Sequence, residues 1–303
     1  MVKRHTEFGH LRSGAIGLVA IAAIAAMAVT GCSAQNQAAV APAVGPQQAA
    51  QDPPQIIGGK DALPGQFPWM ASTKLSVLGL RIPVCGGSLV APQWVLSAAH
   101  CHASWGTRKV SSWNVRLNST QWAAGGTTAK VVAFRDQPGS DLSLLKLDHP
   151  ITGIAPIGFA KASDTAPYQL GARAIGIGWG TTKARNVKPS AVLKWANEET
   201  YPLTTCGNTK SVPNIFCGGA PGGQGAATCL FDSGGPYLFA ENGFDEAGKA
   251  SGRTYVAGTL RGIFNEACGK PGKNDDWQSV SAGSQWITDT LAGNAQGLVT
   301  VKN

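Results

Sequence analysis

The stretch 229–236, with the sequence Cys-Leu-Phe-Asp-Ser-Gly-Gly-Pro, constrains this chain more than any other. Ser233 stands between Asp232 and two glycines, and glycine lets the backbone turn sharply beside a hydroxyl that stays accessible. A serine hydroxyl is a weak nucleophile by itself, so it needs a base, and the base needs a group that orients it. The stretch predicts a nucleophile on a tight turn, together with a histidine and a carboxylate elsewhere in the chain.

Two segments further upstream supply such groups. His100 ends the run of small and apolar residues 94–100, which predicts a buried strand with the imidazole at its end. Asp141 precedes the apolar run 142–147, and a carboxylate there can lie beside the imidazole. Asp136 is a nearby competitor for that role. The predicted catalytic groups therefore follow the chain order His, Asp, Ser.

With these three segments, the chain resembles the trypsin- and chymotrypsin-like serine proteases. The resemblance covers residues 56–292 and implies an all-β fold of two packed antiparallel six-stranded β-barrels with a short C-terminal helix. It implies that Ser233 attacks a peptide carbonyl, that His100 takes the serine proton and that Asp141 orients the imidazole. It also implies an oxyanion hole made by the backbone N–H groups of Phe231 and Ser233.

Phe231 departs from this family, which has glycine at the corresponding position. Phenylalanine keeps the N–H group but resists a positive φ, at a cost of about 1–2 kcal/mol. We therefore expect the oxyanion hole to form under strain or only when substrate binds. This departure supports an alternative function, a catalytically impaired protease-like protein that binds without cleaving.

Apolar runs bounded by turn residues predict the strands of the barrels, at 66–71, 84–90, 113–117, 129–134 and 142–147. The segment 175–180, Ile-Gly-Ile-Gly-Trp-Gly, resembles the strand that opens the second barrel in the family. No helix-forming segment follows it, so it does not predict a dinucleotide site. Residues 284–290 resemble the family's C-terminal helix, and residues 293–303 are expected to form a tail.

Residues 1–31 have the character of an export signal. Basic residues precede an apolar run at 15–29, which is short for a membrane-spanning helix but typical of a signal peptide. The run ends in Val-Thr-Gly-Cys, which resembles a bacterial lipobox, so we expect Cys32 to be lipidated. Ordinary signal cleavage that leaves Cys32 free is the alternative. The chain is expected outside a bacterial cell, secreted or held at the cell membrane as a lipoprotein.

Residues 32–55 are rich in Ala, Gln and Pro and cannot form a core, which predicts a tether or propeptide. The protease-like domain begins at Ile56, and the resemblance implies that the freed ammonium of Ile56 pairs with buried Asp232. Gln55 stands where animal zymogens commonly have Arg or Lys, so activation by a trypsin-like enzyme is not expected. Alternatively, Ile56 simply begins an edge strand.

The chain has seven cysteines, an odd number for an exported protein. Setting Cys32 aside leaves six, and their spacing permits fifteen pairings. The resemblance implies three disulfides: Cys85–Cys101, Cys206–Cys217 and Cys229–Cys268. Such bridges fit an oxidising compartment. There is no C-x-x-C pair, so the cysteines do not favour a metal site, and we expect no metal and no cofactor.

The substrate pocket departs from the family on several walls. Ala227 stands at the position of the pocket base, where trypsins have aspartate. Arg261 and Ile263 fall where the family has a Ser-Trp-Gly strand. Asp275, or its neighbour Asp276, can align with another wall and receive a basic side chain. A small or apolar substrate side chain is equally compatible, and the alternative for both aspartates is an exposed turn.

The formal net charge of +8 and the pI near 9.2 raise the question of a nucleic-acid partner. Lys and Arg are scattered, and no basic run interleaves with aromatic residues, so nucleic-acid binding is not expected. We expect a monomer that acts on a protein or peptide substrate.

Overall fold

The structure is a computed structural model that describes residues 59–104, 109–182, 188–207, 213–225, 227–262, 268–294 and 299–300. The predictions for the signal peptide, Cys32, the tether, Ile56 and Ile263 lie outside these described residues.

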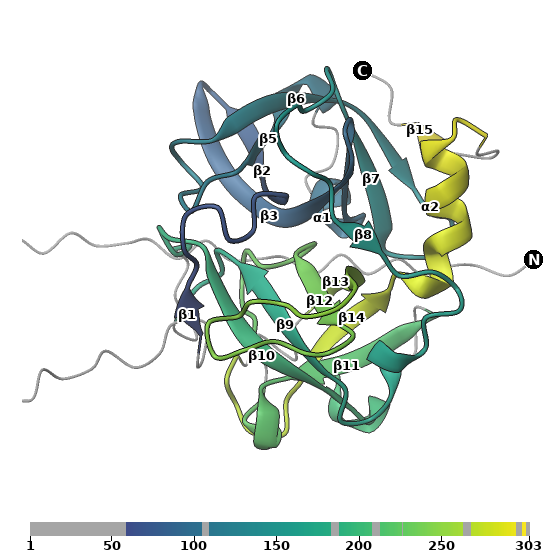
Figure 1. Cartoon of the computed structure of the whole chain (residues 1–303). Helices are drawn as coiled ribbons and strands as arrows, with labels where there is room; N and C mark the ends of the chain where they lie inside the picture. The colour runs from purple at the N-terminus through teal and green to yellow at the C-terminus, as the bar shows by residue number, and fades with distance from the viewer. Residues whose placement is uncertain are drawn as a thin grey trace, which may run out of the picture. The chain divides into compact units, whose positions relative to one another are not determined.

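Six antiparallel strands close the first barrel, drawn in blue and teal in the upper half of Figure 1. They are β2 (Met70–Val77), β3 (Leu80–Ala91), β4 (Trp94–Ala98), β5 (Trp113–Leu117), β6 (Thr127–Asp136) and β7 (Leu142–Leu147). Pairing runs β2–β3–β4–β7–β6–β5 and returns to β2. The two-residue strand β15 (Val299–Thr300) adds to β6.

Six further strands close the second barrel, in green and yellow below. They are β9 (Arg173–Gly178), β10 (Lys194–Tyr201), β11 (Ile215–Gly219), β12 (Pro236–Ala240), β13 (Thr254–Gly262) and β14 (Asp275–Ser279). The ring runs β9–β10–β11–β14–β13–β12. Two short strands extend it, β1 (Lys60–Asp61) on β10 and β8 (Gly158–Phe159) on β13. The predicted fold class of two six-stranded barrels is confirmed.

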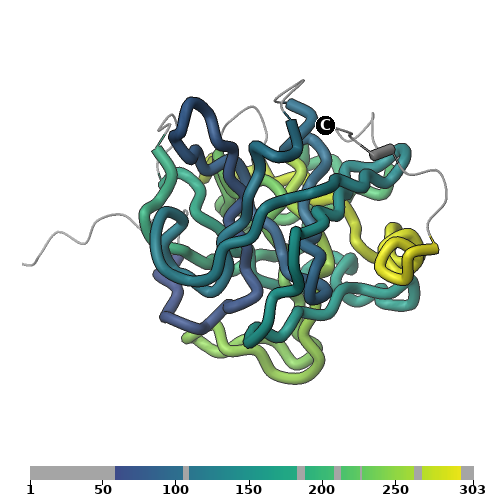
Figure 2. Tube along the Cα trace, turned by 90° about the horizontal axis from the view of Figure 1, so that it is seen from above, coloured from purple at the N-terminus to yellow at the C-terminus, as the bar shows by residue number. Residues whose placement is uncertain are grey.

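Helices are few in the described part of the chain. Helix α1 (His100–Ala103) follows β4, and α2 (Ser284–Leu291) stands at one side of the barrels in Figures 1 and 2. Short 3-10 turns lie at Val110–Ser112, Ala166–Tyr168, Leu203–Thr205, Pro221–Gly223 and Ser281–Gly283. None of the described helices is long and apolar enough to cross a membrane.

Alternation of apolar and polar residues explains the strands. In β6, Ala129, Val131 and Ala133 are buried while Lys130 and Val132 are exposed, as expected for a strand with one face on a core. The strand predicted from residue 66 instead begins at Met70. Gly65 has φ +76° and the next residues form a turn closed by the bond from Met70 N to Phe67 O (3.0 Å), so residues 66–69 cannot pair as a strand.

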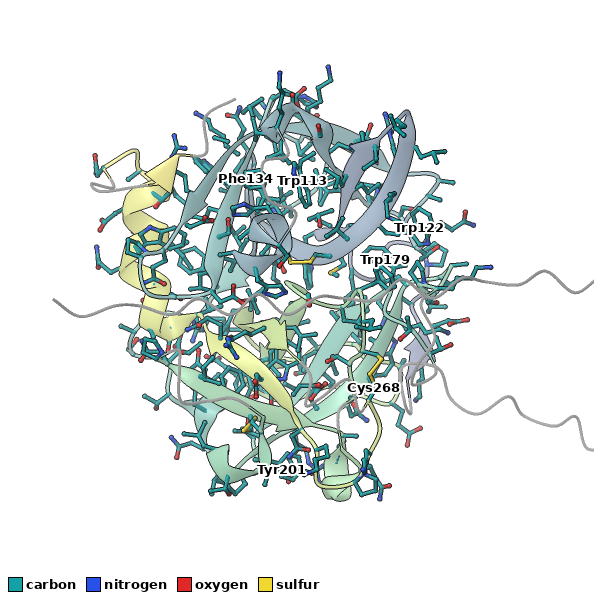
Figure 3. All side chains as sticks on the ribbon, turned by 180° about the vertical axis from the view of Figure 1, so that it is seen from behind. Trp113, Trp122, Phe134, Trp179, Tyr201 and Cys268 are labelled. Atoms are coloured by element: carbon teal, nitrogen blue, oxygen red, sulfur yellow. A yellow bond between two sulfur atoms is a disulfide. The ribbon has the colours of Figure 1, made fainter. Side chains whose placement is uncertain are left out.

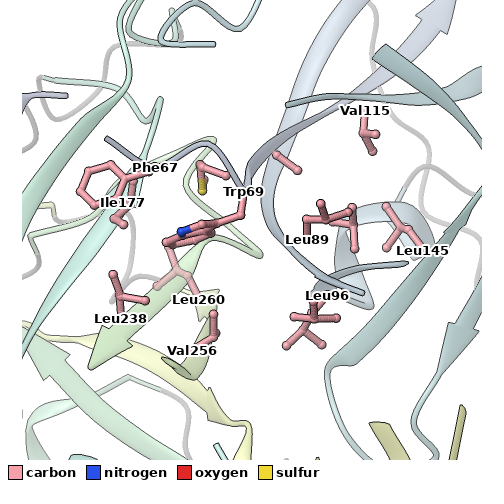
Figure 4. Close-up of a cluster of buried hydrophobic side chains, with 14 of the residues drawn as sticks. Phe67, Trp69, Leu89, Leu96, Val115, Leu145, Ile177, Leu238, Val256 and Leu260 are labelled. Atoms are coloured by element: carbon pink, nitrogen blue, oxygen red, sulfur yellow. The ribbon is translucent and has the colours of Figure 1, made fainter. Parts of the chain in front are cut away.

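Apolar side chains from both barrels meet at Trp69. Figure 4 shows its ring between side chains of the second barrel and side chains of the first: Ile177, Leu238 and Leu260 on one side, and Leu89, Leu96 and Leu145 on the other. The two barrels therefore share one apolar core, and the groups that each barrel presents at the junction are held in a fixed relation.

Candidate active site

The His100 imidazole is oriented by the Asp141 carboxylate. Asp141 Oδ1 accepts the backbone N–H of His100 at 2.8 Å, and Oδ2 accepts Nδ1–H at 2.7 Å. The fold explains this contact, because β4 and β7 pair with Ala98 opposite Leu142, so the residues just beyond the pair are neighbours. With the proton held on Nδ1, the other ring nitrogen, Nε2, is left as an acceptor.

Ser233 lies across the cleft between the barrels from this pair. His100 and Ser233 line a common pocket of about 430 Å³, and the imidazole side chain is 34% exposed. The other lining residues are Ile82, Pro83, Val84, Cys85, Cys101, Ser104, Leu230 and Phe231. The serine hydroxyl and the imidazole, both described, do not hydrogen-bond to each other in this structure. Such contacts are often long without substrate and tighten when it binds.

Backbone hydrogen bonds fix the serine loop against both barrels. Ser233 O accepts the N–H of Gly86 on β3 at 2.8 Å, and Leu260 O on β13 accepts the N–H of Gly234 at 2.8 Å. A Cβ atom at Gly234 would lie 2.3 Å from Ser97 Oγ and 2.7 Å from Gly86 O. The φ of Gly234 is also positive, at +74°. Only glycine fits there, and the close approach brings the serine to the histidine.

Phe231 has the strained backbone that the sequence predicts. Its φ is +77°, a left-handed value that a phenylalanine adopts at a cost. Within the described part of the chain, neither the N–H of Phe231 nor that of Ser233 has an acceptor in the protein. Both amides are thus available beside the hydroxyl, and phenylalanine here adopts the conformation that glycine would take.

Asp232 is buried beneath the serine loop. Its oxygens accept the backbone N–H groups of Gly180 (2.6 Å) and Cys229 (2.9 Å). A Cβ atom at Gly178 or Gly180 would lie 1.9 Å from a carboxylate oxygen, so both glycines make room for it. Burial raises the pKa of Asp232 to about 7, while the two N–H donors oppose this rise.

The structure contains the three disulfides that the resemblance implies: Cys85–Cys101, Cys206–Cys217 and Cys229–Cys268. They are drawn in yellow in Figure 3, where Cys268 is labelled. Cys85, Cys101 and His100 approach one another within 4.8 Å. The two sulfurs are bonded to each other, however, and a disulfide does not supply the thiolate that a metal site needs.

Comparison with known proteins identifies the family of this chain. The family model described as Trypsin matches residues 56–287. The chain belongs to the trypsin family. It is 28% identical over 252 residues to Trypsin-1 of Astacus astacus, covering 77% of this chain and 98% of that protein. It is 26% identical over 252 residues to Transmembrane protease serine 5 of Homo sapiens, covering 78% of this chain. The match spans 51% of that human protein's length.

A second histidine–aspartate pair lies beside the first in this trypsin-family chain. His102, two residues after His100, is buried, at 8% exposure. Its Nε2 contacts Asp136 Oδ1 at 2.8 Å, and its ring stacks on Phe134 at 4.0 Å. Asp136, the sequence competitor of Asp141, therefore binds a different histidine.

The predicted pocket residues lie in or beside the second barrel. Ala227 is buried against Ala196 and Ala220. Arg261 Nη1 pairs with Asp276 Oδ2 at 3.3 Å. Asp275 is fully buried on β14, so the alternative of an exposed turn for the two aspartates is wrong.

Glu198 is a buried carboxyl of the second barrel that the sequence reasoning missed. It lies on β10 and is fully buried, on the same strand face as Ala196 and Thr200. That alternation with small residues is the signal that would have placed it inside the barrel. Burial raises its pKa well above the usual range, and the charges of Asp275 and Asp232 raise it further. Burial likewise raises the pKa of Asp275.

Replacing Phe231 with glycine tests the strain in the serine loop. We expect Phe231→Gly to keep or increase the free energy of unfolding, by up to about 1 kcal/mol, because glycine adopts a positive φ without strain. Leu230→Gly is the matched control: it is equally half-buried but has no positive φ, and should lose about 1 kcal/mol. Urea unfolding of both proteins in a Ser233→Ala background measures this, and equal losses would contradict it.

Glu198→Gln tests the buried carboxyl. A raised pKa means that the folded state holds the proton more tightly than the unfolded state. The group's stabilising contribution is therefore present near pH 4 and is lost as pH rises through the raised pKa. We expect Glu198→Gln to unfold at higher urea concentration than the parent at pH 8, with the difference shrinking toward pH 4. Glu199→Gln changes the next, less buried residue and retains Glu198, so the difference between its unfolding urea concentration and that of the parent should stay constant from pH 4 to pH 8. Parallel pH profiles for all three proteins would contradict this account.

Proposed function

We propose that this chain is an exported serine endopeptidase in which Ser233, His100 and Asp141 act as a catalytic triad. The observation that carries the proposal is the 2.7 Å contact between His100 and Asp141 beside a pocket that Ser233 also lines. The chain belongs to the trypsin family, and a domain of this family implies a serine endopeptidase that acts on a peptide substrate. The particular residues, the anchoring and the activation of this chain are our proposal.

The proposed reaction uses the imidazole of His100 with its proton on Nδ1 and with Nε2 free to accept another. His100 Nε2 takes the proton of Ser233 as Oγ attacks the peptide carbonyl carbon, and Asp141 stabilises the imidazolium that forms. The tetrahedral intermediate collapses, the C–N bond breaks, and His100 gives the proton to the leaving amine. Water then attacks the acyl-enzyme with His100 again as base, which releases the acid and restores Ser233.

The developing oxyanion is held by the amides of Phe231 and Ser233. Losing one such donor costs roughly 3 kcal/mol of transition-state stabilisation, so their orientation decides the rate. The positive φ of Phe231 supports a formed hole, since it is the backbone conformation that glycine would give. The same strain supports the alternative function, a protein that binds peptides and cleaves them poorly.

Activation would occur when the chain is cut before Ile56. The new ammonium would pair with Asp232, whose buried carboxylate is held by amides only among the described residues. An ammonium supplies the opposite charge that a buried carboxylate lacks. Because Gln55 precedes the junction, the activating protease would not require a basic residue there.

The N-terminal segments would place the enzyme outside a bacterial cell. Residues 1–31 would direct export, lipidated Cys32 would anchor the chain in the membrane, and residues 32–55 would be the tether or propeptide. The three disulfides support an oxidising compartment. We expect the catalytic domain, 56–292, to act as a monomer without a cofactor.

One preparation tests triad and activation together. The exported chain carries a recognition sequence for an added site-specific protease in place of residues 51–55, so that it folds whole and is then cut before Ile56. A fluorophosphonate probe is added before and after cutting, with Ser233→Ala as control, and labelling is mapped by peptide mass spectrometry. We expect labelling at Ser233 only after cutting.

The other outcomes are equally informative. Rapid labelling of Ser233 before cutting would keep the protease and remove the activation mechanism. A folded, disulfide-bonded chain that stays unlabelled after cutting would contradict the enzyme and favour the binding protein.

A further inference from the structure

The turn between β2 and β3 holds a leucine in a backbone conformation that disfavours it. Val77 pairs with Leu80, so the hairpin closes through the two residues Leu78 and Gly79 (Figure 1). Their φ values are +49° and +82°. A two-residue turn with two positive φ values favours asparagine, aspartate or glycine at its first position. The turn itself therefore does not explain the leucine.

The leucines of this hairpin are exposed at its tip. Leu78 is 99% exposed and Leu80 is 70% exposed, which makes them the two most exposed large apolar side chains in the described part of the chain. Each gives up the stabilisation that burial of a leucine would bring. Two such side chains side by side at one tip suit an apolar contact outside the folded domain.

Three cationic residues share one face of the strands next to this tip. Ser76 on β2 pairs with Arg81 on β3, and Ser72 on β2 pairs with Arg116 on β5. Lys74 lies between the two serines on β2, and side chains two residues apart on a strand point to the same side. The cationic face, defined as Lys74, Arg81 and Arg116, therefore runs from the hairpin across β2 to β5.

The cationic face lacks counter-charges among the described residues. Lys74 is 1% exposed, and its ammonium lies 6.0 Å from the centre of the Trp122 ring, which is labelled in Figure 3. Burial lowers the pKa of Lys74 to about 8, and repulsion by Arg116 and Arg81 lowers it further. Arg116 Nε is buried without a partner in the described part of the chain.

None of these three cations forms an ion pair with a described carboxylate. The carboxylate that lies along the same sheet, Asp148, accepts the N–H of Lys130 on β6 at 3.0 Å and contacts His149 Nδ1 at 2.9 Å. Its charge is therefore used at β6, away from the hairpin. An anionic group brought to the hairpin from outside would relieve the repulsion there.

We propose that the tip of the β2–β3 hairpin docks on an anionic lipid surface, with Leu78 and Leu80 entering the interface and the cationic face binding the phosphate groups. Apolar side chains beside cations are the combination that binds such an interface, because apolar burial and attraction to anionic lipids add. An acidic polymer in solution would neutralise the cations but leave the leucines in water. The inference goes beyond the proposed peptidase function and does not require it.

Docking would have a consequence for the proposed enzyme. The cut before Ile56 separates the domain from the proposed anchor at Cys32, so a second contact would keep the activated domain at the membrane. The hairpin also borders the cleft, because Ile82, Pro83 and Val84 on β3 line the same pocket as Ser233. The cleft would therefore open beside the lipid surface, toward proteins held there.

Vesicle flotation of the cut Ser233→Ala chain measures docking without the anchor and without self-cleavage. The chain folds whole, is cut before Ile56 by the added protease and is separated from its N-terminal fragment. It is then mixed with vesicles of phosphatidylcholine alone, or of phosphatidylcholine and phosphatidylglycerol in equal parts. We expect binding to the mixed vesicles to be tighter by roughly tenfold or more, and to weaken as salt is raised.

Matched variants separate the hairpin from the net charge of the chain. Leu78→Asn keeps the turn, because asparagine favours this position, and Arg81→Gln removes an exposed cation. Each is expected to weaken binding to the mixed vesicles by roughly fivefold or more. Leu170→Asn, at a leucine that is 69% exposed, and Lys161→Gln make the same changes elsewhere on the surface and should leave binding unchanged.

A fluorescent label reports whether the tip enters the interface. The six cysteines of the cut domain form three disulfides, so Leu80→Cys introduces a single free thiol. An environment-sensitive fluorophore attached there should brighten and shift to the blue when mixed vesicles are added. The same fluorophore attached through Leu170→Cys should not respond.

Four results would overturn the proposal. The folded parent fails to bind mixed vesicles, or the hairpin and control variants weaken binding equally, which would show that net charge alone attracts the chain. The two fluorophores respond alike, or polyglutamate competes fully with the vesicles and binds Leu78→Asn as well as the parent, which would assign the cations to a soluble acidic partner. Fluorophosphonate labelling of Ser233 is independent of all four, so the peptidase stands or fails separately.

Discussion

The close approach of glycine backbones at the junction of the two barrels determines where every reactive group lies. Gly86 donates to Ser233 O, and Gly234 packs so tightly on β3 and β4 that even a methyl group would collide. His100 is the second residue after the end of β4, so this contact brings a histidine of one barrel to a serine of the other. The apolar core around Trp69 makes the junction rigid, because packed side chains transmit displacement rather than absorb it.

Buried charge is the second constraint, and it is concentrated below the serine loop. Asp232, Glu198 and Asp275 each lie in the interior, and burial raises the pKa of all three. Such groups oppose folding when ionised unless a cation reaches them. For Asp232, the ammonium that we propose to form at Ile56 would be such a cation.

The sequence predicted the fold, and nominated the residues of the proposed triad, from local patterns. The apolar run before His100, the run after Asp141 and the glycines after Ser233 each mark a strand end or a turn. The features that the sequence analysis did not predict depend on contacts between segments that are distant in the chain. The burial of His102 depends on Phe134 and Asp136, and the surroundings of Glu198 depend on β14, some 77 positions later in the chain than Glu198. The strand expected from residue 66 begins instead at Met70, because a turn follows Gly65. Gly65 is a local turn signal that was already visible in the sequence.

The central claim is that Ser233 becomes covalently acylated during turnover. The most direct measurement mixes the activated chain with an activated ester, quenches with acid within the first turnover and maps the acyl group by peptide mass spectrometry. The account predicts one acyl group per active site, on Ser233, that forms in a burst and disappears as substrate is exhausted. An acyl group on another residue, or hydrolysis that persists in Ser233→Ala, would contradict it.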